Sequence, residues 1–387
     1  MPELFKNKED CCGCTACLNV CPKKAIQMVE DDKGYLYPTI DEKLCIDCNI
    51  CEKVCPLKIE NDKLSFKQVA YGIKNKDDEE RKKSSSGSVF IEIAKAVLKE
   101  NGVVFGVEMN SDFVVHHSCA NTLKQVRKFQ GSKYVQSIKG NNYLKVKENL
   151  MEGKKVLFTG TPCEVSGLKK YLGKEYGNLI TVDIICHGVP SQKLLRKFVD
   201  EKEKSFKSKL KDITFRDKKF GWRNQEIHIN FENNKDYHAP IWDDEFYRLF
   251  TGNYILRESC YTCHFANMNR QGDITIGDFW NIKNVKEDFE DILGVSSILI
   301  NTEKGMKIFN LIKSNFNYFE CDLDEIVQAN LRHPSVKPDN FEEFKKDFEL
   351  RGLDYCLKKY GKMNGVEKMK RFLSPLTKKV KKIIIKG

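Results

Sequence analysis

The stretch CCGCTACLNVCP (residues 11–22) holds five cysteines and ends on proline. A second stretch, CIDCNICEKVCP (residues 45–56), repeats the spacing C-x2-C-x2-C-x3-C-P. Three cysteines spaced by two residues can wrap one corner of an iron–sulfur cubane, while the fourth, held out by the turn at proline, reaches a second cluster. The repeat therefore predicts two clusters in one small module.

This spacing is that of the bacterial two-cluster ferredoxins, and it assigns the ligands. The first 4Fe-4S cluster is predicted on Cys11, Cys14, Cys17 and Cys55. The second is predicted on Cys45, Cys48, Cys51 and Cys21. Structural zinc is the alternative, but zinc sites use pairs of C-x2-C and need neither the third cysteine nor the proline. Cys12 falls outside the repeat and is interpreted as a bystander.

The composition is that of a soluble globular protein, with 387 residues, 16 cysteines and a formal net charge of +11. No apolar run approaches the roughly 18 residues of a membrane-spanning helix, and the N-terminus lacks the apolar core of a signal peptide. We therefore expect a cytoplasmic protein, whose cysteines suit metal or redox chemistry better than disulfides. Bound clusters would cancel much of the positive charge, so a lysine-rich surface is favoured over nucleic-acid binding.

The chain is predicted to divide into a module, a body and a tail. Residues 1–62 form the ferredoxin domain, in which AIQMVEDDKGYLYPTI (residues 25–40) predicts a hairpin around an Asp-Lys-Gly turn. Residues 63–150 and 151–320 form the two parts of the body, and residues 321–387 form a helical, basic tail. The expected fold class is an α+β ferredoxin-like two-cluster module followed by an α/β body and a mostly helical C-terminal segment.

Short β-rich runs alternate with amphipathic helices in the body. The predicted strands are VAYGIK (69–74), GVVFGVEM (102–109), FVVHHSCA (113–120), KVLFTG (155–160), LITVDIIC (179–186), ITFRD (213–217), EIHINF (226–231) and DITIGDF (273–279). The predicted helices cover residues 89–100, 143–151, 164–172 and 192–203.

Four cysteines of the body stand in places where binding sites form. Cys163 and Cys186 follow predicted strands, and the carboxyl ends of such strands meet at one edge of an α/β sheet. Cys260 and Cys263 supply a C-x2-C pair. Four such thiols suit a third 4Fe-4S cluster or a zinc site, and a reactive thiol at Cys163 is a further possibility. The remaining cysteines of the body are predicted to be buried small apolar residues: Cys119, Cys321 and Cys356.

The chain resembles the beta-subunit family of coenzyme F-420 hydrogenases and dehydrogenases over residues 8 to 315. The matching motifs, in order, are the double ferredoxin run, KSSSGSVF, GSKYVQS, VLFTGTPCEVSGLKKYL, DIICHGVPS, FRDKKFGW, CYTCHF and ITIGDFW. The resemblance implies an FAD-binding iron–sulfur protein, with a cluster near the flavin on Cys163, Cys186, Cys260 and Cys263. Three positions depart from the family pattern: Ser88 and Asn281 stand where we expect glycine, and Glu164 replaces a usual glutamine.

The flavin contacts are predicted in two segments and at one histidine. KSSSGS precedes an apolar helix, and Ser84, Ser85, Ser86 and Gly87 could cradle phosphate there, although an ordinary serine cap is the alternative. Lys133 is expected to hold flavin phosphate and Tyr134 to stack on a ring, with a surface lysine and a core tyrosine as the alternatives. His187, next to Cys186, is expected to tune the cluster or flavin through a hydrogen bond, or to make a structural one. No catalytic residue is identified.

These features predict an iron–sulfur flavoprotein oxidoreductase that passes electrons between a hydride carrier, coenzyme F-420 or NAD(P)H, and one-electron partners. A flavin would bridge the two-electron and one-electron chemistries. The alternative is a non-catalytic subunit that relays electrons to a separate enzyme. A zinc-stabilised nucleic-acid-binding protein is a third reading. Lysines and apolar residues interleave in the tail, which could rest on a membrane surface or a partner.

Overall fold

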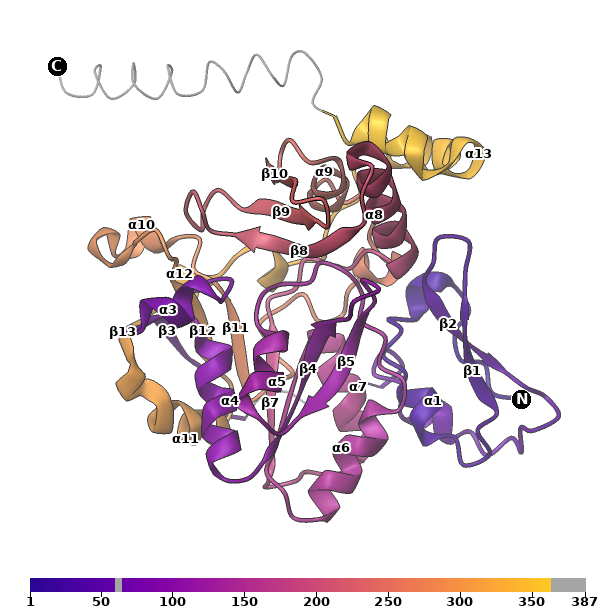
Figure 1. Ribbon diagram of the computed structural model, residues 1–387. Helices are drawn as coiled ribbons and strands as arrows, with labels where there is room; N and C mark the ends of the chain where they lie inside the picture. Colours follow the sequence, from indigo (N-terminus) through magenta and orange to yellow (C-terminus); the bar gives the residue numbers. More distant parts are fainter. Residues whose placement is uncertain (60–64, 363–387) are drawn as a thin grey trace. The chain divides into compact units, whose positions relative to one another are not determined.

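The computed structural model describes residues 1–59 and 65–362 (Figure 1). These residues form two compact units: residues 1–238 with 255–336, and residues 239–254 with the chain from 337 onward. The first unit holds every cysteine predicted to bind a cluster. The second contains α9 (Glu245–Thr251) and α13 (Phe341–Tyr360), and the latter is kinked at Gly352. The predicted helical tail is seen only as far as α13, because the rest lies outside the described residues.

The N-terminal module consists of α1 (Ala16–Val20), β1 (Ile26–Glu30), β2 (Leu36–Ile40) and α2 (Ile50–Lys53). The predicted hairpin is confirmed: β1 and β2 pair antiparallel, and Gly34 in the turn has φ of 85°. That positive φ favours glycine, which has no Cβ to clash. The first cysteine run precedes β1 and the second follows β2, so the hairpin brings both runs to its open end.

The sequence repeat is also a repeat of backbone conformation. Gly13 and Thr15 flank Cys14 with φ of 67° and 66°, and Asp47 and Asn49 flank Cys48 with φ of 52° and 55°. Thr15 and Asn49 then begin α1 and α2. Left-handed residues are uncommon outside glycine, and three of these four are not glycine, so their matching positions indicate the same loop built twice.

A mixed sheet of eight strands forms the centre of the body. Across the sheet its strands are β13 (Phe316–Cys321), β3 (Val69–Asn75), β12 (Ser296–Ile300), β11 (Ile274–Asp278), β7 (Leu179–Ile184), β6 (Val156–Gly160), β4 (Val103–Met109) and β5 (Val115–Ala120). β11, β7, β6 and β4 run parallel, and the outer pairs are antiparallel. The predicted strands are found, whereas β12 and β13 were not predicted.

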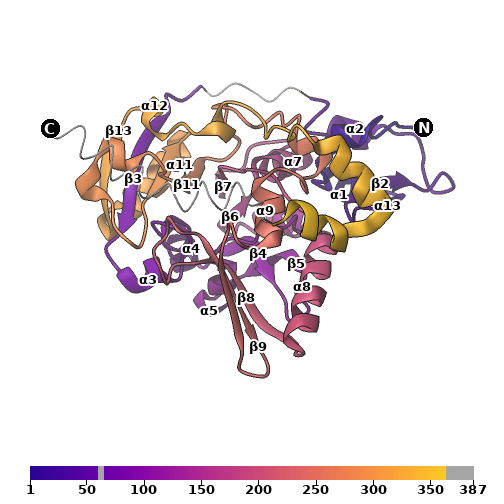
Figure 2. The ribbon, with the colours of Figure 1, turned by 90° about the horizontal axis from the view of Figure 1, so that it is seen from above.

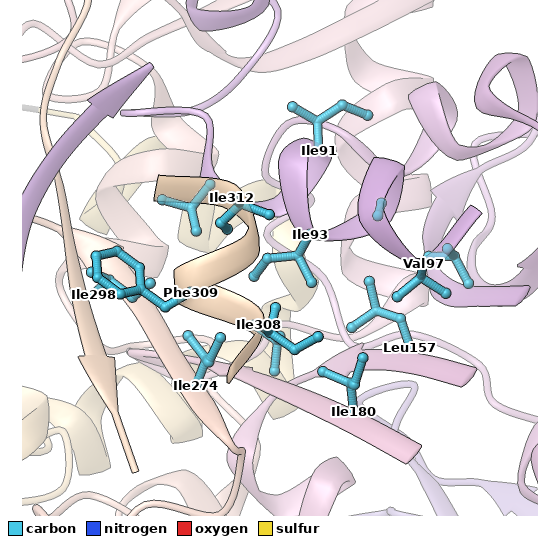
Figure 3. Packing of buried hydrophobic residues seen from close by; sticks show 14 of the residues in the cluster. Ile91, Ile93, Val97, Leu157, Ile180, Ile274, Ile298, Ile308, Phe309 and Ile312 are labelled. Carbon is cyan, nitrogen blue, oxygen red and sulfur yellow. The ribbon is translucent and has the colours of Figure 1, made fainter. Parts of the chain in front are cut away.

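The faces of this sheet carry different layers. α4 (Val89–Lys99) and α11 (Glu303–Ile312) cover one face, where Ile93 and Ile308 pack with Leu157 of β6 (Figure 3). α6 (Asn142–Met151) and α7 (Pro162–Leu172) pack with Phe158, the next residue along β6, which points to the opposite face. Cys14 and Ala16 of the module belong to that second core. The module is therefore packed into the body and shares its core.

A smaller sheet follows the large one along the chain. It has the order β10 (Asp236–Pro240), β9 (Glu226–Phe231) and β8 (Leu210–Asp217), and α8 (Gln192–Phe206) precedes it. The long β8–β9 hairpin is clearest in Figure 2. The short helices are α3 (Asp78–Lys82), α5 (Leu123–Val126), α10 (Ile282–Val285) and α12 (Leu323–Ile326). No helix within residues 1–59 and 65–362 is long and apolar enough to cross a membrane.

Candidate metal centres

The four cysteines predicted for a third site are brought to one pocket, although they come from distant parts of the chain. The pocket contains about 660 Å³ of empty space, partly open to solvent. Its lining includes Cys163, Cys186, Cys260 and Cys263. The structure thus supplies at one place the four thiols that a 4Fe-4S cluster requires.

The parallel core of the sheet places the first two of these thiols. β6 and β7 are parallel neighbours, so their carboxyl ends meet at the same edge. Cys163 is the second residue of α7, directly after β6, and Cys186 lies just beyond the end of β7. Pro162 at the first position of α7, together with a capping box between Thr161 and Glu164, fixes the start of the helix and so the position of Cys163.

A buried arginine holds the C-x2-C loop against the sheet. Arg270 is 3% exposed and donates from Nη1 to the Phe265 carbonyl at 2.9 Å and from Nη2 to the Ile184 carbonyl at 3.0 Å. Its guanidinium also lies 3.3 Å from Asp183 of β7. These contacts tie the loop that carries Cys260 and Cys263 to the strand that ends before Cys186.

The electrostatics of the pocket disfavour free thiolates but suit bound metal. Burial raises the pKa of Cys260 to about 12 and that of Cys263 to about 11. Burial also raises the pKa of Cys186 well above its usual value. A cluster would supply the positive charge that deprotonates such thiols. In the described part of the chain, no three His, Cys, Asp or Glu side chains converge as the ligands of a single metal ion would.

The second ferredoxin site is also a pocket lined by its predicted ligands. Its lining includes Cys21, Cys45, Cys48 and Cys51. Cys21 comes from the first sequence run and the other three from the second, which is the crossed arrangement that the spacing predicts. Every residue of this lining lies between positions 2 and 51, and Cys48 is exposed. The binding of a cluster here remains a prediction.

The first ferredoxin site lies against the body. Burial, together with the neighbouring Cys11 and Cys55, raises the pKa of Cys17 to about 12, which places these three thiols close to one another. Cys14 packs on α7, where a Cβ added to Gly167 would meet the Cys14 Sγ at 2.9 Å. Glycine at position 167 therefore allows the close approach of module and helix.

Three residues near these sites were not singled out by the sequence. Cys12, interpreted as a bystander, lines the third pocket, and its hydrogen bond with the Cys163 thiol raises the pKa of Cys163. Leu57 lines the same pocket, and so does Arg257. Cys12 directly follows Cys11, and Leu57 lies two residues after Cys55, so the third site adjoins the first ferredoxin site. Neither belongs to a motif, and only tertiary packing could identify them.

Glu164 belongs to a buried polar cluster beside Cys163. Its carboxylate accepts hydrogen bonds from Lys139 Nζ at 2.9 Å and from Ser137 Oγ at 3.0 Å. Burial alone would raise the pKa of Glu164, but the charges of Lys139 and His117 outweigh it and lower the pKa to about 2. The side chain of Lys139 is only 1% exposed. The glutamate at a position where we expect glutamine is therefore matched by a buried lysine.

The two segments predicted to bind flavin lie side by side. Ser85 Oγ is 2.8 Å from Ser132 Oγ, and Gln130 donates to Ser84 Oγ at 3.2 Å. Burial lowers the pKa of Lys133 to about 7, and its ammonium donates to the Lys128 and Gln130 carbonyls. These hydroxyls and the lysine are donors of the kind that bind phosphate.

Other predicted flavin contacts have structural partners. Ser86 Oγ donates to the Val295 carbonyl, and the Gly87 N–H donates to Ser296 Oγ, both at 2.8 Å. A Cβ at Gly87 would meet the Ile73 carbonyl oxygen at 2.3 Å, so this glycine allows α4 to approach the sheet. Ser88, where we expect glycine, has φ of 71°, the left-handed conformation that glycine adopts most easily.

Arg216 joins Tyr134 to a third family motif. Its Nη1 donates to Tyr134 Oη at 3.2 Å and to Asp278 at 2.8 Å. Arg216 was not predicted as a site residue, although it lies within the motif FRDKKFGW. His187 lines the third pocket together with the four predicted ligands of that site. The predicted contacts thus fall into two groups, one near Ser85 and Tyr134 and one at the thiol pocket.

The remaining cysteines of the body are only partly as predicted. Cys356 is buried. Cys119 is exposed and Cys321 is partly exposed, so the expectation of burial was wrong for Cys119. Cys119 lies on β5, an edge strand, and successive residues of a strand point to opposite faces.

Comparison with known families agrees with the resemblance seen in the motifs. The C-terminal region of the coenzyme F420 hydrogenase/dehydrogenase beta subunit matches residues 153–325, and the 4Fe-4S dicluster domain matches residues 10–59. Residues 153–325 therefore belong to the C-terminal part of this beta-subunit family. The N-terminal module of the chain is a 4Fe-4S dicluster domain. The beta-subunit match spans Cys163, Cys186, Cys260 and Cys263.

Individual relatives share only part of this chain. An uncharacterized ferredoxin of Methanocaldococcus jannaschii is 35% identical over 54 residues, which are 14% of this chain and 69% of the relative. An uncharacterized protein from the rpl9-rpl11 intergenic region of Porphyra purpurea is 41% identical over 54 residues, 13% of this chain and 69% of the relative. A chain of the F420-reducing [NiFe] hydrogenase complex from Methanosarcina barkeri is similar in structure, with 18% identity and a TM-score of 0.45. That similarity covers 70% of this chain and 87% of the other.

Proposed function

We propose that this chain is an iron–sulfur flavoprotein oxidoreductase of the beta-subunit family. It passes electrons between a hydride carrier, coenzyme F420 or NAD(P)H, and one-electron partners through FAD and three 4Fe-4S clusters. The observation that carries the proposal is the lining of the third pocket, which combines the four body cysteines with Cys12 and Leu57 of the ferredoxin module. That continuity gives electrons a path from the body into the module.

The proposed ligands divide into three sets of four thiols, and each set would hold one cluster. The third set is Cys163, Cys186, Cys260 and Cys263, and Arg270 holds its loop in place. The two ferredoxin sets are those that the repeat assigns. Their order follows from packing: the first set adjoins the body, and the second lies in a pocket of module residues alone.

The proposed flavin site lies where KSSSGS meets GSKYVQS. Lys133, Ser84 and Ser85 would bind the phosphates, and Tyr134, oriented by Arg216, would contact the ring. A bound flavin would supply the exchange between hydride and single electrons. The protein would contribute position and charge.

A second function, a non-catalytic electron-transfer subunit, is favoured by one observation. Ser86 Oγ and the Gly87 N–H are hydrogen-bonded to the chain at Val295 and Ser296, so half of the proposed phosphate cradle is already used. In this alternative, electrons would reach the thiol sites from a separate enzyme, and the chain would have no hydride site.

Anaerobic purification followed by analysis of iron, sulfide and flavin tests both functions. We expect about twelve iron atoms per chain, which is three cubanes of four. Addition of coenzyme F420H2 or NAD(P)H should then bleach the flavin. About eight irons would remove the third cluster from the proposal. Full iron without flavin that a donor can reduce would favour the non-catalytic subunit, and zinc without iron would contradict both.

A further inference from the structure

Arg257 is a buried cation at the boundary between the module and the body. It is 1% exposed and stands three residues before Cys260. Its side chain nevertheless points to the first ferredoxin run: Nε donates to the Cys11 carbonyl at 2.8 Å, and Nη2 lies 3.6 Å from the Cys11 Sγ. Arg257 thus contacts a proposed ligand of the first cluster from the loop that carries two proposed ligands of the third.

The remaining donors of Arg257 fix its orientation. Nη2 donates to the Leu36 carbonyl at 3.0 Å, and Nη1 donates to Gln136 Oε1 at 2.9 Å. The ring of Tyr37 lies 4.1 Å from the guanidinium carbon. Gln136 in turn donates from Nε2 to the Cys12 carbonyl at 2.9 Å. Because a guanidinium is planar, these contacts leave it one orientation toward Cys11.

The counter-charge of Arg257 is not a carboxylate. Within residues 1–59 and 65–362, no Asp or Glu forms an ion pair with it. Burial of an unpaired charge is strongly unfavourable, so such a cation requires a negative group nearby. A 4Fe-4S cluster with four thiolates is negatively charged, and the Cys11 thiolate would be its nearest part.

We propose that Arg257 is the positioning residue that couples the third site to the first ferredoxin cluster and raises the reduction potential of that cluster. This inference rests on the proposed function, because it requires a cluster on Cys11. Reduction adds one negative charge to the cluster, and a fixed cation with an N–H directed at a ligand sulfur stabilises the reduced form. The first cluster is therefore a better acceptor for electrons from the third site than its twin in the module.

The second ferredoxin site offers an internal comparison. The described residues that line its pocket include Lys23 but no arginine, and Cys48 is exposed to solvent. The two clusters share one sequence repeat and one loop conformation, so a difference in potential between them reflects their surroundings. Arg257 is a buried cation in contact with the first set of ligands.

Redox titration followed by electron paramagnetic resonance of the full-length holoprotein tests the proposal. In Arg257→Gln, the reduction equilibrium of the first cluster should shift at least tenfold toward the oxidised form, a fall of about 59 mV for one electron. The second cluster should stay within twofold of the parent. The Cys48→Ala variant, which lacks a ligand of the second cluster, identifies the signal of the first.

Two further variants separate a specific contact from general effects. Lys53→Gln removes one positive charge from an exposed position of the same module and should leave both potentials within twofold of the parent. Arg257→Lys keeps the charge but loses the planar fork, so we expect a shift of about threefold in the same direction. If Arg257→Gln fails to retain its iron, Arg257→Lys decides the question.

The outcomes distinguish this inference from the function on which it rests. Normal iron content with unmoved potentials in Arg257→Gln, or parental potentials in Arg257→Lys, would overturn the role of Arg257 and leave the proposed function intact. A parent protein without iron would overturn both. A shift of similar size in Lys53→Gln would show that any charge near the module has this effect, which also overturns the proposal.

Discussion

Two pockets of this molecule each contain one proposed set of four cysteine ligands, but they are built in different ways. The pocket with Cys21 and Cys48 is lined only by residues 2–51, within one short module. The pocket with Cys163 and Cys263 takes its thiols from two strand ends and a loop about a hundred residues apart, and two module residues complete its wall. The first pocket follows from local spacing and turns. The second depends on a folded sheet, so its ligands converge only when the body is intact.

The largest expected effect tests whether the dispersed pocket, the one that contains Cys163 and Cys263, is a metal site at all. Cys263→Ala removes one ligand of the C-x2-C pair, and about four irons should be lost because a cluster short of one thiolate is labile. The two ferredoxin clusters should remain visible by electron paramagnetic resonance, and electron flow through the module should slow sharply. Cys356→Ala, at a buried position of α13, is the control. Full iron in Cys263→Ala would remove the contrast between the two pockets.

The next effect concerns the scaffold of the dispersed pocket. Lys139→Met leaves the Glu164 carboxylate buried without its cation, which should destabilise the fold by about 3–5 kcal/mol. The double variant Lys139→Met/Glu164→Gln removes both charges and should regain most of that loss. Chemical denaturation under anaerobic conditions measures both. If the double variant is no more stable than the single one, the ion pair with Lys139 is not the reason why position 164 carries glutamate.

A pH dependence tests the part of the body proposed to bind flavin. The pKa of Lys133 is lowered by burial to about 7, whereas phosphate binds the protonated ammonium. Above pH 7 the free protein must take up a proton to bind FAD, so affinity should fall by up to about tenfold per pH unit. FAD titrations from pH 6 to 8.5, roughly one unit either side of the shifted pKa, measure the slope.

A matched lysine separates this effect from general charge. Lys133→Met should weaken FAD binding near pH 6 and abolish the slope, whereas Lys128→Met, at a side chain that is 67% exposed, should do neither. The same slope in Lys133→Met and the parent would place the flavin phosphate elsewhere.

The smallest expected effect compares the two ferredoxin sites, which differ in their exposure to solvent. Cys48 is exposed, whereas the proposed first ferredoxin site is packed against α7 through Cys14. During oxidation in the presence of a chelator, the second ferredoxin cluster should therefore disappear severalfold faster than the first. Electron paramagnetic resonance spectra recorded over time measure the rate at which each cluster signal decays. Equal rates would indicate that burial does not protect the inner cluster.

Sequence periodicity was sufficient for most of the secondary structure but not for every strand of the large sheet. β6 and β7 were predicted because each is a short apolar run before a helix or a turn. β12 was missed: its five residues are all buried, and a short buried run has no alternation to reveal it. The hairpin was predicted because an Asp-Lys-Gly turn between two β-rich runs specifies it locally.

Local sequence patterns were enough to identify the ferredoxin module, its eight proposed ligands and the beta-subunit family that residues 153–325 match. Those features are local, because a cysteine spacing, a turn or a motif depends only on residues that are close together in the sequence. The positions of Cys12 and Arg257 between the first and third sites, and the pairing of Lys139 with Glu164, became visible only in the folded chain. Contacts between residues far apart in sequence arise from packing of the module on the sheet. A single sequence carries no spacing that encodes them.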